Sequence, residues 1–134
     1  MKRNHYNIQD FGAVGDPTVL NTKAVQKAID TCHEEGGGVV RIEGGTFLTG
    51  TLVLKDEVVL EVEAGAVLKG SPDIGAYAEN CGRNMYRGEP EMDRCLIFAR
   101  GARNIGIRGR GMIDGNGNAA TFPNSDDPQR NRPM

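Results

Sequence analysis

The stretch GGGVVRIEGGTFLTGTLVLKDEVVLEVEAGAVLKG, residues 36–70, consists of short aliphatic runs separated by glycines and charged residues. The runs at 39–42, 52–54, 58–62 and 66–68 are too short for helices and are bounded by turn-forming residues, so we predict β-strands. Similar runs return at 96–98, 105–107 and 112–113. Hairpins usually place Asn-Gly or Asp-Gly turns between longer alternating strands, whereas the spacers here are irregular.

A weak internal repeat in the sequence indicates how these strands are arranged. LVLKDEVVLEVEAGAVLKG (52–70) and LIFARGARNIGIRGRGMIDG (96–115) share one order of apolar triplet, charged spacer, alternating strand and glycine turn. Self-similarity at a period of roughly 20 to 50 residues is typical of a solenoid. We therefore predict an all-β solenoid, a right-handed parallel β-helix whose first coils span 39–117. A small β-sandwich with one helix is the alternative.

A single segment has helical periodicity. In LNTKAVQKAIDTCHEEGGG (20–38), apolar residues at 24, 25, 28, 29 and 32 recur on one helical face, which predicts a helix over about 22–35. Asn21 or Thr22 is suited to cap its start, and Gly36 to end it in a left-handed conformation. Because the end of a β-helix exposes its core, we expect residues 1–38 to form an N-terminal strand and a capping helix.

Composition excludes several classes of function. The net charge of −2 over 134 residues and the scattered Lys and Arg give no basic patch for nucleic acid or an anionic membrane. No apolar run is long enough to span a bilayer, and MKRNHYNIQD (1–10) lacks the apolar stretch of a secretory signal.

The three cysteines form no Cys-x-x-Cys pair, so neither a zinc site nor a disulfide framework is indicated. Cys32 lies on the apolar face of the predicted helix, and we expect it to be buried. Cys81 and Cys95 bracket a polar stretch. Pairing of these two in an oxidising compartment and three free thiols are both compatible with the spacing.

Residues 71–94, SPDIGAYAENCGRNMYRGEPEMDR, interrupt the strand pattern. A polar stretch of this length is a functional excursion or a solvated loop. An Arg fork pairs with a carboxylate and a Tyr ring stacks on a pyranose, so this loop is suited to an acidic sugar. The residues of these two types are Tyr77, Arg83, Tyr86, Arg87 and Arg94. We take Arg83, Tyr86 and Arg87 as the candidate substrate-binding residues.

Several segments together resemble the N-terminal coils of polygalacturonase-type glycoside hydrolases. They are NIQDFGAVGD (7–16), NTKAVQKAIDTC (21–32), the stretch from Gly36 to Tyr77, and NIGIRGRGMIDGNG (104–117). The first two are also similar to the openings of phage tailspikes and other pectate-lyase-like β-helices. GTFLTGTLVLK (45–55) and GRGMIDGNG (109–117) favour the polygalacturonase type. Pro17 and Glu43 depart from the family's usual turn residues, glycine and proline, and a β-helix should tolerate both changes.

The resemblance implies inverting hydrolysis of α-linked galacturonic acid or related pectic sugars. An inverting site needs an acid and a base roughly 6.5 to 9.5 Å apart. The family carries them in Asn-Thr-Asp and Gly/Gln-Asp-Asp motifs, supported by Gly-His-Gly and Arg-Ile-Lys, and the sequence contains none of the four. Asp126 and Asp127 are neighbours in a Pro/Asn/Ser-rich stretch and cannot hold that separation, so we interpret them as a turn. Asp114 is expected to be a structural turn carboxylate.

We therefore expect no catalytic residue, metal site or cofactor within these 134 residues, with 118–134 a loop leading to a further coil. The expected partner of the full-length protein is a pectic oligo- or polysaccharide, and the family suggests secretion or a periplasmic location. Because the C-terminal end of the coils is open, we expect self-association there. The alternatives are a non-catalytic stem of tailspike type and an inactive gene remnant.

Overall fold

The chain winds into coils whose strands form three parallel sheets. The computed structural model describes residues 4–78, 81 and 94–117. The first sheet has the order β1-β2-β5-β8, the second β3-β6-β9, and the third β4-β7. Their bounds are β1 Asn4–Asn7, β2 Gly38–Ile42, β3 Thr46–Thr49, β4 Leu52–Val53, β5 Val58–Val62, β6 Val67–Gly70, β7 Ile97–Phe98, β8 Gly106–Arg108 and β9 Met112–Asp114.

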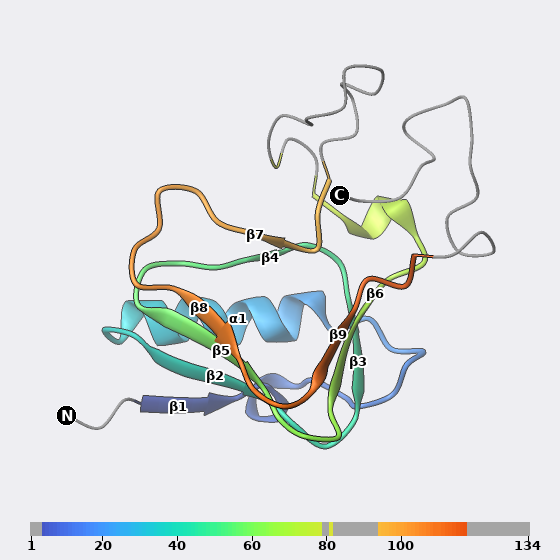
Figure 1. Ribbon diagram of the computed structural model, residues 1–134, viewed down its shortest axis with the longest axis horizontal. Coiled ribbons are helices and arrows are strands. Elements are labelled where there is room, and N and C mark those ends of the chain that lie inside the picture. The colour runs from blue at the N-terminus through green and yellow to red at the C-terminus, as the bar shows by residue number, and fades with distance from the viewer. Residues whose placement is uncertain (1–3, 79–80, 82–93, 118–134) are drawn as a thin grey trace.

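Each circuit of the chain adds one strand to each sheet in turn. Coil 1 is β2-β3-β4, coil 2 is β5-β6-β7, and coil 3 begins with β8-β9, as Figure 1 shows. All the pairings between the described strands are parallel, with Val40 opposite Leu60 and Leu60 opposite Ile107 in the first sheet. Parallel stacking of successive coils is the β-helix that the sequence predicts, and the β-sandwich alternative is wrong.

The turn between β8 and β9 requires glycine. Gly109 has φ +120°, and a Cβ built there would overlap the carbonyl oxygen of Val62 in the coil beneath. Gly111 donates its backbone N–H to the same carbonyl at 2.9 Å. The glycines of GRGMIDG therefore let coil 3 lie directly on coil 2.

Helix α1, Thr22–Glu34, lies across one end of the coils beside β1 and β2 (Figure 1). Its buried residues Val25, Ala28, Ile29 and Cys32 are four of the five that the periodicity predicts. The helix ends as expected, with Gly36 at φ +99° and the N–H of Gly37 bonded to the carbonyl of Cys32 at 2.8 Å.

The start of α1 differs from the prediction. Asn21 occupies the N-cap position, but its side chain makes no capping bond. Its amide instead bonds the backbone N–H and carbonyl of Val14 and the carbonyl of Val19. The hydroxyl of Thr22 accepts from Gly50 N–H at 2.7 Å. Both side chains fix the helix to neighbouring segments because those backbone groups would otherwise be left without partners.

The strand at Thr46–Thr49 was not predicted. Burial alternates along it, since Phe47 and Thr49 point into the core while Thr46 and Leu48 do not. The sequence Thr-Phe-Leu-Thr shows no such alternation, and the flanking Gly44-Gly45 and Gly50 make it look like a turn region. Without alternation in the sequence there is no strand signal, and pairing with β6 makes it a strand.

Burial decreases sharply in the third coil. Leu60 and Leu68 are fully buried, whereas their register partners Ile107 and Ile113 are 48% and 42% exposed. Met112, next to Ile113, is 58% exposed. Coil 3 thus covers the core beneath it and leaves its own apolar side chains uncovered.

Candidate functional site

The polar excursion that the sequence singles out leaves the coils between β6 and β7. Its described parts are residues 71–78, Cys81 and residues 94–96, and they include the short 3-10 helix η2, Ile74–Ala76. A Cβ on Gly50 would overlap the carbonyl oxygen of Ala76. Glycine at the corner between β3 and β4 therefore lets the base of the excursion pack directly on coil 1.

The three candidate substrate-binding residues, Arg83, Tyr86 and Arg87, lie outside the described residues, as do Asp126 and Asp127. Their roles stay predictions.

Tyr77 is a structural anchor of the excursion. Its side chain is only 4% exposed, and its hydroxyl donates to the carbonyl of Ser71 at 2.8 Å. Burial raises the pKa of Tyr77 to about 12. The ring is not free to stack on a sugar, so the suggestion that Tyr77 contacts substrate is wrong.

Two further side chains brace the same base. Arg94 donates from Nη1 to the carbonyl of Ile74 at 3.0 Å. The Thr51 hydroxyl donates to the carbonyl of Cys95 at 2.6 Å and accepts from Ala78 N–H at 2.8 Å. Thr51 therefore holds the outgoing and returning segments together, a role that sequence reasoning missed because its partners are 27 and 44 residues away.

The outer face of the first sheet carries a charge ladder, which we define as Arg41, Glu61, Glu63 and Arg108. Arg41 Nε lies 3.5 Å from Glu61 Oε1 and 3.3 Å from Glu63 Oε1. Arg108, one coil further on, donates from Nε to Glu61 Oε2. The ladder runs along the stacking direction, so opposite charges bind successive coils together.

The two carboxylates of the ladder shift each other's pKa in opposite directions. A hydrogen bond from Glu63, together with the bond to Arg108, lowers the pKa of Glu61. The bond to Glu61 raises the pKa of Glu63. Glycosidases separate their carboxyl groups by about 5 Å or more. Glu61 and Glu63 are both paired with the same Arg41 guanidinium, so they do not form such a site.

Other carboxylates hold turns. Asp114 accepts from Asn116 N–H at 2.8 Å, as expected of a structural turn carboxylate. Asp56 accepts from Arg103 N–H at 2.7 Å, and Glu57 accepts from the Asn104 side chain at 2.6 Å. The turn before β5 is thereby fixed to the turn before β8 in the coil that follows.

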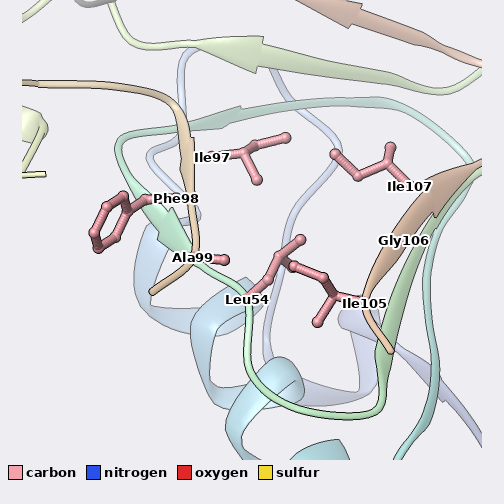
Figure 2. Close-up of a pocket in the computed structure, with 7 residues that line it drawn as sticks. All are labelled: Leu54, Ile97, Phe98, Ala99, Ile105, Gly106 and Ile107. Carbon is pink, nitrogen blue, oxygen red and sulfur yellow. The ribbon is translucent and has the colours of Figure 1, made fainter. Parts of the chain in front are cut away.

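A hollow of about 390 Å³ lies at the open end of the coils between β7 and β8. Figure 2 shows its lining, which carries no charged side chain: Leu54, Ile97, Phe98, Ala99, Ile105, Gly106 and Ile107. Without an acid, a base or a hydrogen-bonding side chain, this hollow can bury apolar atoms but cannot perform hydrolysis.

Within residues 4–78, 81 and 94–117, no group of three or more His, Cys, Asp or Glu side chains lies close enough to hold a metal ion. None of the helices in that part of the chain is long and apolar enough to cross a membrane.

Comparison with known families shows to which family the chain belongs. The model of the family described as rhamnogalacturonase A/epimerase, pectate lyase-like, matches residues 5–130. The chain belongs to this family. The resemblance to polygalacturonase-type, pectate-lyase-like proteins drawn from the sequence is confirmed by this match and by the relatives that follow.

Relatives within the pectate lyase-like family include polygalacturonases. An exo-poly-alpha-D-galacturonosidase of Dickeya chrysanthemi is 37% identical over 83% of this chain and 19% of its own length. The structure of a family 28 exopolygalacturonase from Yersinia enterocolitica superposes with a TM-score of 0.73 at 39% identity, over 87% of this chain and 21% of that one. A hyperthermoactive exopolygalacturonase from Thermotoga maritima gives 0.72 at 26% identity, over 90% and 28%. The chain spans about a fifth of the length of the Dickeya relative.

Proposed function

We propose that this chain forms the N-terminal cap and first coils of a glycoside hydrolase that cleaves galacturonan-type pectic polysaccharide. The observation that carries the proposal is the 37% identity with an exo-poly-alpha-D-galacturonosidase over 83% of the chain. In this proposal the catalytic carboxylates lie on further coils, which stack on β7, β8 and β9. Two features support that arrangement: the uncovered Ile107 and Ile113, and the apolar hollow that Ile107 helps to line.

The chemistry proposed for the complete enzyme is single-step inversion. One carboxylic acid protonates the glycosidic oxygen while a carboxylate removes a proton from water on the opposite face of the sugar. Five of the described carboxylates have structural partners: Glu61 and Glu63 in the charge ladder, and Asp56, Glu57 and Asp114 in turns. The role of the present coils is to hold the first turns of the solenoid rigid.

The excursion at 71–94 is the part of this chain that we propose to contact substrate. Arg83 and Arg87 would pair with galacturonate carboxylates, and Tyr86 would stack on a sugar ring. The anchoring of its base through Tyr77, Thr51 and Arg94 supports this role. A binding segment must be held at both ends if its side chains are to meet a polymer in a defined position.

The proposal is tested by assaying the purified 134-residue chain and the longest product of its gene side by side on polygalacturonate. We expect reducing ends from the longer protein alone, and proton NMR should show the β-anomer as the first sugar formed from the α-linked substrate. Turnover by the 134-residue chain would overturn the placement of the carboxylates. A longer product without turnover would overturn the hydrolase assignment and favour a non-catalytic stem.

A further inference from the structure

Cys81 and Cys95 stand on either side of residues 82–94, a polar stretch whose sequence shows no strand pattern. Cys81 is 5% exposed, and its thiol donates to the carbonyl of Ala78 at 3.4 Å. Cys95 is half-buried, next to Leu96, whose carbonyl accepts from Leu52 N–H at 2.7 Å. Backbone carbonyl groups thus help to position both cysteines.

Thr51 brings the two segments to one point. Its hydroxyl bonds Ala78 N–H, three residues before Cys81, and also bonds the carbonyl of Cys95 itself. The side chain of Thr51 is 7% exposed, so water has little access to replace either bond. This arrangement fixes the distance between the two segments whatever the intervening residues do.

The Cys81 and Cys95 thiols influence each other. Both are free in the structure. Burial, and after it the neighbouring Cys81 thiol, raises the pKa of Cys95 to about 12. Two cysteines on segments that one hydroxyl group already holds together need little backbone movement to reach the geometry of a disulfide.

We propose that Cys81 and Cys95 form a disulfide under oxidising conditions and so staple the base of the 71–94 excursion to the second coil. The proposal rests on the bonds of Thr51, which hold the two cysteine-bearing segments together, and on the bond from the Cys81 thiol to Ala78. It is independent of the proposed enzymatic function. It decides between the two possibilities that the cysteine spacing left open.

The oxidation needs an electron acceptor, and a small-molecule disulfide such as oxidised glutathione supplies it. A cysteine thiolate attacks one glutathione sulfur, which releases the first glutathione as a thiol and leaves a mixed disulfide. The second cysteine loses its proton and attacks the protein-bound sulfur, and the second glutathione leaves. Two cysteine thiols are oxidised, and one glutathione disulfide is reduced to two thiols. Because Cys95 ionises with difficulty, the exchange should be faster in mildly alkaline buffer.

The disulfide closes the loop from Cys81 to Cys95, which lowers the conformational entropy of the unfolded state. Its consequence for the native protein is local. The segment that carries Arg83, Tyr86 and Arg87 is then fixed by a covalent bond as well as by the hydrogen bonds of Thr51. Disulfides of this kind persist in secreted and periplasmic proteins.

The test is peptide mapping of the full 134-residue chain after incubation with oxidised glutathione, with a matched sample kept in dithiothreitol. Free thiols are blocked with iodoacetamide, and the protein is digested with trypsin without reduction. Cleavage at Lys69, Arg83, Arg94 and Arg100 places the two cysteines on separate peptides, 70–83 and 95–100. We expect these peptides to be joined, with the loss of two hydrogen atoms, in the oxidised sample alone.

Cys32 provides the internal control. It is fully buried against the core, and burial raises its pKa to about 11. A Cys32→Ser variant should keep the linked peptide and the rise in thermal midpoint on oxidation, whereas Cys81→Ser and Cys95→Ser should lose both. Iodoacetamide-labelled Cys81 and Cys95 after oxidation, a link to Cys32, or linkage between separate chains alone would each overturn the proposal.

Discussion

Glu61 is the residue that connects the charge ladder across coils. It contacts Arg41 on β2 and Arg108 on β8. Such surface pairs contribute little individually. Their interest here lies in the opposite pKa shifts of Glu61 and Glu63, which give the ladder a recognisable dependence on pH.

The contribution of Glu61 and Glu63 to the free energy of unfolding should be greatest near pH 4.5, the ordinary value for glutamate. The pKa of Glu61 is lowered in the folded state, so its contribution is present above this pH and is lost as the pH falls through the folded pKa. The pKa of Glu63 is raised, so its contribution is present below this pH and is lost as the pH rises through the folded pKa. Urea titrations at a series of pH values should show this maximum in the wild type.

The Glu61→Gln variant should flatten that maximum because it removes both shifts together. Glu34→Gln, an exposed substitution on α1, is the matched control and should leave it unchanged. If Glu61→Gln keeps the pH profile of the wild type, these two carboxyl groups do not shift each other's pKa.

At the scale of the elements, α1 acts as the plug of the closed end. Its buried face covers core side chains that the first strands would otherwise expose to water. Ile29 is fully buried in this contact, whereas Lys27, two residues earlier, is exposed.

Ile29→Ala should lower the free energy of unfolding by about 2–5 kcal/mol, since it removes buried methylene groups and leaves a cavity. Lys27→Ala on the same helix should change it by no more than about 0.5 kcal/mol. Equilibrium denaturation in urea measures both values. Equal effects of the two substitutions would mean that α1 does not cover the core.

The helix was predictable because its signal is local: apolar residues recur at helical spacing. The seven predicted strands also exist, with ends that differ by up to two residues. The strand at Thr46–Thr49 and the bonds of Thr51 were not predicted, because they depend on which residues become neighbours after a full circuit of the chain. The structure does not describe Arg83, Tyr86 and Arg87, so the substrate-binding prediction still needs an experiment.

At the scale of the whole molecule, the two ends of the coil stack differ. One end is covered by α1, and the other presents the strand edges of β7, β8 and β9 with Ile107, Met112 and Ile113 exposed. Unpaired strand edges beside an apolar surface favour association with another chain. We therefore expect the isolated 134-residue chain to associate through this end.

The measurement that tests the open-ended β-helix most directly is sedimentation velocity over a range of protein concentrations. The wild-type chain should sediment faster as its concentration rises, and the Ile107→Lys/Ile113→Lys variant should remain monomeric because it places two charges on the open end. Val14→Lys, at an exposed apolar residue in the turn before α1, should associate as the wild type does. A wild-type chain that stays monomeric at every concentration and unfolds cooperatively would contradict the open end on which this account depends.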